Sequence, residues 1–160
     1  MRRCLPQAAA LLAAAPLAAQ TLWIVPAEFE VAPGQRVAVS FDGEAGRAPE
    51  PVELRGAALY TAQAAYNVVN LRREDGAVTG EATARGEGTL ALGVCAGPGH
   101  TRCAKALLYS LAPGGPIATR PLGLRFEIVP ETDPHRLRSG EVLAVRVLFE
   151  GNPAAGAELA

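Results

Sequence analysis

The chain has little lysine, few aromatic residues and no long apolar run, and each shortage excludes a class of protein. Its 15 Lys and Arg residues against 16 Asp and Glu give a formal charge of −1, whereas a nucleic-acid-binding domain carries a basic excess. No stretch reaches the roughly 18–20 apolar residues that a membrane-spanning helix needs. The 13 Pro and 17 Gly disfavour long helices. A length of 160 residues fits one domain, or one and a fraction.

The sequence also lacks the residue combinations that enzymatic catalysis needs. Its two histidines, His100 and His135, form no His-Glu-x-x-His motif. Its three serines, Ser40, Ser110 and Ser139, lie outside any Gly-x-Ser-x-Gly elbow. We therefore expect that the protein is not an enzyme and has no catalytic residues, and a hydrolase is the least favoured hypothesis.

The N-terminus has the pattern of a secretory signal. Arg2 and Arg3 precede an apolar stretch at residues 8–15, and small residues follow up to Ala19. The pattern predicts a signal peptide over residues 1–19 and a mature chain that starts at Gln20. The alternative is an alanine-rich start that is helical or disordered.

The cysteine count changes with this processing. Cys4 leaves with the signal, so that Cys95 and Cys103 remain. An even count in a secreted chain favours a disulfide bond, and the Gly97-Pro98-Gly99 turn between them would bring the two sulfur atoms together. The alternative is a metal site that includes His100, but structural zinc usually has four ligands. A Cys95–Cys103 disulfide is therefore the preferred prediction.

Apolar residues alternate with polar ones along much of the mature chain, as in half-buried strands. The strongest stripes lie at residues 37–41, 124–128 and 143–149. Weaker candidates are residues 57–60, 66–71, 77–84, 89–94 and 104–111. Short strands at this spacing, separated by Gly-rich turns, predict an all-β immunoglobulin-like sandwich over residues 20–120.

Two stretches repeat one order of features. Residues 24–43 and residues 128–151 each begin with Ile-Val-Pro and end with an alternating strand, a Phe, an acid and a Gly. The offset is about the size of one immunoglobulin-like domain, although β-hairpins share this pattern by chance. We expect residues 121–160 to be the start of a second β-domain that is truncated here and whose remaining strands would lie downstream.

Several strings resemble a known family. They are Thr21–Pro26, Ala104–Leu108, Gly123–Pro134, Arg136–Gly140 and Val145–Gly151. Together they resemble secreted bacterial proteins of the DUF4198 family. The resemblance implies a periplasmic, β-rich, non-enzymatic protein associated with nickel and cobalt uptake.

The chain departs from this family at two positions. Many relatives have a terminal His, which offers an amine and an imidazole to nickel, where this chain has Gln20. Relatives often have Tyr after an Asp-Pro or Asn-Pro pair, where this chain has His135.

The candidate metal ligands are therefore His135, Asp133 and His100. For each there is a simpler interpretation, because Asp-Pro is a turn signal and a lone His is often a solvated loop residue. Trp23 is a candidate surface aromatic for ligand stacking, or otherwise a core residue.

Two functions follow from these features. The first is a periplasmic accessory or binding protein of a transition-metal uptake system, with nickel or cobalt as ligand and a metal transporter or a TonB-type receptor as partner. The alternative is a structural or adhesion-type cell-surface sandwich without a small ligand.

Overall fold

The computed structural model describes residues 22–43, 49–97, 102–111 and 116–155. The predicted signal peptide and His100 lie outside these ranges. The described strands are β1 (Leu22–Pro26), β2 (Glu30–Val31), β3 (Arg36–Gly43), β4 (Ala58–Tyr60), β5 (Ala65–Asn67), β6 (Val69–Glu74), β7 (Ala77–Thr83), β8 (Thr89–Ala96), β9 (Arg102–Ser110), β10 (Phe126–Pro130), β11 (Val145–Phe149) and β12 (Asn152–Pro153). Short 3-10 helices are η2 (Pro51–Leu54), η4 (Ile117–Thr119) and η5 (Pro134–Arg136).

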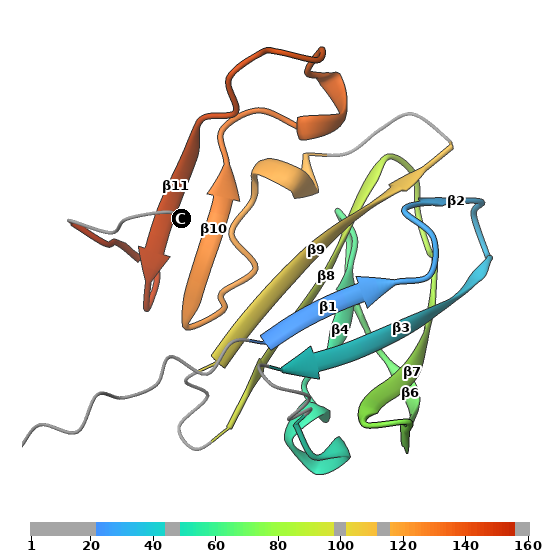
Figure 1. Ribbon diagram of the computed structural model, residues 1–160. Helices are drawn as coiled ribbons and strands as arrows, with labels where there is room; N and C mark the ends of the chain where they lie inside the picture. The colour runs from blue at the N-terminus through green and yellow to red at the C-terminus, as the bar shows by residue number, and fades with distance from the viewer. Residues whose placement is uncertain (1–21, 44–48, 98–101, 112–115, 156–160) are drawn as a thin grey trace, which may run out of the picture.

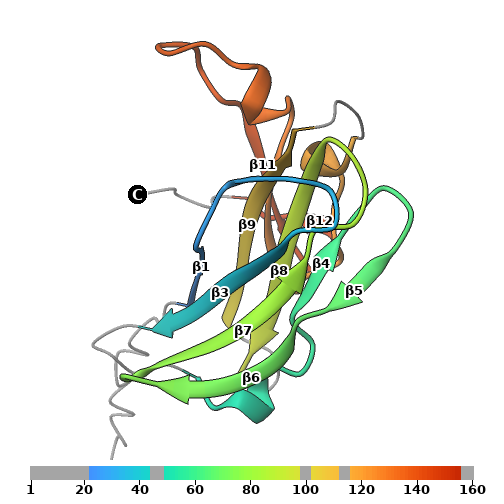
Figure 2. The same ribbon diagram turned by 90° about the vertical axis from the view of Figure 1, so that its right-hand side faces the viewer.

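Two sheets pack face to face (Figure 1). The first has the strand order β1-β3-β7-β6 and is antiparallel throughout. The second has the order β2-β9-β8-β4-β5, with β2 parallel to β9 and the other pairs antiparallel. In Figure 2 the strands β1, β3, β7 and β6 of the first sheet lie side by side. The predicted all-β sandwich is confirmed.

Alternation in the sequence explains how the two sheets share one core. In β3, every second residue is buried, including Val37, Val39 and Phe41. In β8, Leu90 and Leu92 belong to the same buried cluster. Successive side chains of a strand point to opposite faces, so one face of each sheet supplies the core.

Strand β8 is buried on both faces. Besides the core residues, Thr89 and Ala91 on its other face are 3% and 0% exposed. Residues 116–155, which we call the annex, cover this outer face. A Cβ atom on Gly93 would lie 3.0 Å from Leu122 Cδ1 and 3.2 Å from Tyr60 Cε2. Glycine at this position therefore lets the annex approach the sheet closely.

The annex contains the third sheet, with the strand order β10-β11-β12. Figure 1 shows β10 and β11 beside β9, on the side away from β3. The repeated stretches of the sequence form similar pairs: β1 pairs antiparallel with β3, and β10 with β11. The last paired residue of the first strand is a proline in both pairs: Pro26 lies opposite Val39, and Pro130 lies opposite Val145. The division between residues 120 and 121 into two domains stays a prediction.

Most predicted strands are present, and one is divided. The stretch 66–71 is split because the chain passes from one sheet to the other: β5 pairs with β4 in the second sheet, where the Val68 N–H still donates to Ala57 O at 2.9 Å, and β6 pairs with β7 in the first. Asn70 then adopts a φ of 56°, and the register with β7 shifts between Val69 and Arg72. The change of sheet therefore divides an apolar pattern that continues in the sequence.

Strands β10 and β11 form a hairpin, which we call the annex hairpin, and both of its faces carry apolar side chains. Glu127, Val129 and Leu148 face inward and are 2%, 0% and 4% exposed. Phe126 and Ile128, predicted to share an apolar face with Leu124, remain 41% and 40% exposed, whereas Leu124 is buried in the turn before β10. The sequence pattern alone does not distinguish these two environments, because both contain apolar residues.

Candidate functional site

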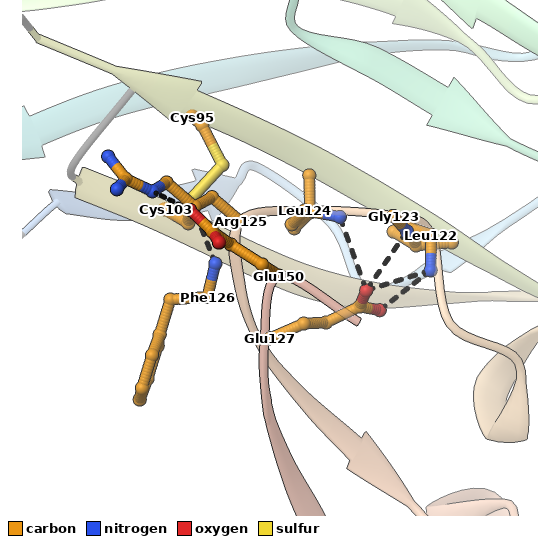
Figure 3. The surroundings of a disulfide bond; sticks show 9 residues. All are labelled: Cys95, Cys103, Leu122, Gly123, Leu124, Arg125, Phe126, Glu127 and Glu150. Atoms are coloured by element: carbon orange, nitrogen blue, oxygen red, sulfur yellow. Dashed lines mark hydrogen bonds and ion pairs between the residues drawn. A yellow bond between two sulfur atoms is a disulfide. The ribbon is translucent and has the colours of Figure 1, made fainter. Parts of the chain in front are cut away.

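Cys95 and Cys103 lie opposite each other in β8 and β9. Cys95 pairs with Cys103 in the register, their Cα atoms are 4.0 Å apart, and the sulfur atoms are bonded. Figure 3 shows this disulfide against the annex, where the Phe126 N–H donates to Cys103 Sγ at 3.5 Å. The predicted disulfide is confirmed, and it lies at the contact between the sandwich and the annex.

A buried carboxylate organises the turn that leads into β10. Glu127 Oε1 accepts a hydrogen bond from the Leu122 N–H at 2.8 Å, and Oε2 accepts from the N–H groups of Leu122, Gly123 and Leu124 at 2.9, 3.1 and 3.4 Å (Figure 3). Backbone donors stabilise an ionised carboxylate that is withdrawn from water. Glu127 therefore holds the turn that covers Gly93.

The same carboxylate forms an ion pair with Lys105 of β9. Lys105 Nζ lies 2.8 Å from Glu127 Oε1, and the two side chains are only 9% and 1% exposed. Sequence reasoning missed this pair. The available signal was that Lys105 is the one lysine among 15 basic residues.

The negative charge of the Glu127 carboxylate also affects the pKa of Tyr60 in β4. Burial raises the pKa of the Tyr60 hydroxyl above its ordinary value of 10.0, and the negative charge of Glu127 raises it further. The junction between sandwich and annex thus groups a carboxylate, an ammonium and a phenol.

Asp133 caps the short helix η5. Its Oδ1 accepts from the His135 N–H at 3.1 Å, and its Oδ2 accepts from the Thr89 hydroxyl at 2.6 Å. Because Thr89 begins β8, this bond ties the tip of the annex to the sandwich. The turn role that an Asp-Pro pair predicts is confirmed.

His135 lies beside Asp133, with its ring on β9. Its imidazole stacks on the Tyr109 ring at a centroid distance of 3.3 Å and an angle of 12°. Both residues line a hollow of about 300 Å³, whose wall also includes Phe29 and Glu30. Among the described residues, no group of three or more His, Cys, Asp or Glu side chains is placed to hold a metal ion. Of the three predicted metal ligands, Asp133 and His135 lie in one turn, and His100 lies outside the described residues.

Trp23 is a surface residue. It lies in β1 and is 49% exposed, as is its neighbour on the same face, Val25, at 51%. Of the two interpretations of the sequence, core packing is wrong. Trp23 belongs to the first sheet, whereas Asp133 and His135 contact strands of the second.

A second hollow of about 330 Å³ separates β9 from the annex hairpin. Its lining is mostly apolar and consists of Cys103, Ala104, Lys105, Leu107, Phe126, Glu127, Ile128, Pro130, Pro134, Leu143 and Val145. Leu107 and Pro134 also line the hollow beside His135. We call the two hollows together the β9 groove.

In the part of the chain that the structure describes, no helix is long and apolar enough to cross a membrane. Residues 99–160 match the family model DUF4198, described as a domain of unknown function. The match covers the annex and β9, and it supports the resemblance found in the sequence. No curated protein and no solved structure matches the chain.

Proposed function

We propose that this chain is a secreted, periplasmic, non-enzymatic accessory or binding protein of a transition-metal uptake system, with nickel or cobalt as its ligand. The signal-like N-terminus supports secretion. The Cys95–Cys103 disulfide agrees with it, because such bonds persist in oxidising compartments.

One observation carries the metal assignment. Asp133 and His135, predicted as ligands from the sequence, lie in one turn beside an open hollow that also has Glu30 in its wall. Imidazole suits nickel and related metals. Water would fill the remaining coordination positions, because no third His, Cys, Asp or Glu among the described residues is placed with these two.

The donors present suit a transient site better than a permanent one. Both oxygens of Asp133 already accept hydrogen bonds, so a metal would compete with the Thr89 hydroxyl. A protein that passes its metal to a transporter or a TonB-type receptor must release it, and few chain ligands make release easier.

Calorimetric titration of the chain from Gln20 with Ni²⁺, Co²⁺, Cu²⁺ and Zn²⁺ tests the proposal. We expect micromolar binding of nickel or cobalt that is lost in His135→Ala and retained in the matched control His100→Ala. Loss only in His100→Ala would move the site to that loop. No binding of any of the four ions would contradict the metal function.

The alternative, a structural or adhesion-type module, is favoured by the exposed apolar side chains Phe126, Ile128 and Phe149 of the annex. The neighbouring genes separate the two functions. A transporter or TonB-type receptor gene beside this one supports metal uptake, whereas surface-assembly genes support the structural role.

A further inference from the structure

We propose that the β9 groove binds an amphipathic organic cation, which is a small free molecule with an apolar body and an amine or quaternary ammonium end. The proposal does not depend on the metal function. It rests on the shape of the groove, on the apolar side chains at one end, and on the acidic and aromatic side chains at the other.

The groove has the dimensions of a small-molecule site. Its two hollows, of about 330 and about 300 Å³, share Leu107 and Pro134 as wall residues. Each hollow is at the lower end of the range for ligand pockets. They follow the outer face of β9 from Cys103 to Tyr109, which corresponds to about 20 Å of strand. An elongated ligand therefore fits better than a compact one.

One end of the groove is apolar and accessible. Phe126, Ile128 and Leu143 line it and are 41%, 40% and 42% exposed. Contiguous apolar side chains at a surface mark binding sites. The charged groups here, Lys105 and Glu127, neutralise each other, so this end selects an apolar body.

The other end is acidic and aromatic. Glu30 and Asp133 line it together with Phe29, Tyr109 and His135, and the His135 ring covers one face of the Tyr109 ring, so that Phe29 is the open aromatic side chain. Phe29 is 59% exposed, and among the described residues Glu30 has no ion-pair or hydrogen-bond partner for its carboxylate. Aromatic faces with nearby carboxylates attract amines and quaternary ammonium groups. The charge of this end therefore selects a cation.

Paired titrations test both ends of the groove. The chain from Gln20 is titrated in a calorimeter with decyltrimethylammonium or with decanoate, below the micelle concentration and with EDTA present. We expect saturable binding of one decyltrimethylammonium per chain, and binding of decanoate weaker by about tenfold or more. Equal affinity for the two probes, or no saturable binding of the cation, would overturn the proposal. Because EDTA removes free metal, this result is separate from that of the metal titration.

Three variants locate the ligand. Glu30→Gln should weaken binding of the cation and leave that of decanoate unchanged. Ile128→Asn should weaken binding of both probes, while its matched control Val69→Asn, at a 52% exposed position of β6, should bind as the unmodified chain does. Circular dichroism checks that each variant is folded. Unchanged binding of the cation by folded Ile128→Asn would place the ligand elsewhere.

The assignment to a free molecule has its own test, because choline lipids carry the same end group. The chain should remain in the supernatant after sedimentation with phosphatidylcholine vesicles. Co-sedimentation that Ile128→Asn abolishes would assign the groove to a membrane lipid and overturn the proposal.

Discussion

At the scale of single residues, Glu127 links the turn before β10 to strand β9, a connection that its position in the sequence does not indicate. Its carboxylate accepts hydrogen bonds from three backbone N–H groups of the turn before β10 and pairs with Lys105 of β9. A buried charge is tolerated only when its partners are in place. Removal of the carboxylate would leave both the turn amides and a buried ammonium without their partner.

We expect Glu127→Ala to lower the free energy of unfolding by about 3–5 kcal/mol, the usual effect of breaking a buried ion pair. Glu127→Gln keeps one acceptor oxygen for the turn and should lose less. Glu150→Ala is the control, because its pair with Arg125 is 57% exposed on the Glu150 side, and it should lose no more than about 1 kcal/mol. Urea unfolding measures all three, and equal losses for Glu127→Ala and Glu150→Ala would contradict the role of Glu127.

Tyr60 gives a pH-dependent signal from the same junction. Burial, and then the Glu127 charge, raise the pKa of Tyr60 above its ordinary value of 10.0. As the pH rises above 10.0, the Tyr60 hydroxyl of the unfolded chain loses its proton, while that of the folded chain still retains it. The folded state then binds more protons than the unfolded state, so stability falls as the pH rises through this window.

Ultraviolet titration of the tyrosinate absorbance checks this prediction, with Tyr60→Phe to identify the signal. We expect Tyr60 to ionise above pH 10.0 and its pKa to fall in Glu127→Gln, which removes the negative charge. An unchanged Tyr60 pKa in folded Glu127→Gln would show that Glu127 has no influence on it.

At the scale of elements, β8 and β9 form the centre of the molecule. They pair along their whole length, from Thr89–Tyr109 to Ala96–Arg102, and the disulfide crosslinks them near one end. Core side chains lie on one face of this pair and the annex on the other. A change in the pairing would therefore affect both layers.

We expect the double variant Cys95→Ala, Cys103→Ala to lose about 2 kcal/mol of stability, because it removes a crosslink that constrains the unfolded chain. Urea unfolding of the oxidised chain from Gln20 and of the variant measures the difference. A thiol assay on the denatured, unreduced chain should find no free thiol. Two free thiols per chain would show that the bond does not form in the expressed protein.

At the scale of the whole molecule, the question is whether the sandwich is stable without the annex. Leu124, Glu127, Val129 and Leu148 are buried at their contact, and so is the outer face of β8. An isolated hairpin is only marginally stable in water, so the annex depends on the sandwich. The sandwich in turn would expose Ala91 and Lys105 if the annex were absent.

We expect a chain that ends at Arg120 to have a melting temperature several degrees lower than the chain that ends at Ala160, because it exposes this outer face to water. Thermal unfolding followed by circular dichroism compares the two chains. The longer chain with Ile128→Asn is the control and should keep its melting temperature, because Ile128 is on the exposed side of the hairpin. An unchanged melting temperature in the shorter chain would instead support two independent domains divided after residue 120.

The alternation of apolar and polar residues was sufficient to predict the sandwich and most of its strands, and the even number of cysteines after the predicted signal was sufficient to predict the disulfide. These features depend on local periodicity and on the number of cysteines, and both can be read directly from the sequence. The stripe at residues 37–41 alternates with polar residues and has one buried face, so β3 follows directly from its pattern.

The candidate site was only partly predictable. The Asp-Pro turn was visible, but the sequence did not show that Thr89 donates to Asp133 or that the His135 ring stacks on Tyr109, because these partners are far apart along the chain. The same is true of Lys105 and Glu127, which lie on different layers. Only packing of the annex on the second sheet brings them together.

Tertiary structure also decided which apolar residues of the hairpin are buried. Phe126 and Val129 are both apolar, yet only Val129 is covered, because the docked face of a strand is selected by its neighbours and not by its own hydrophobicity. The sequence by itself determined that β10 would form and that it would carry apolar side chains. The orientation of the strand against β9 determined which of them face the groove, since successive side chains of a strand point to opposite sides.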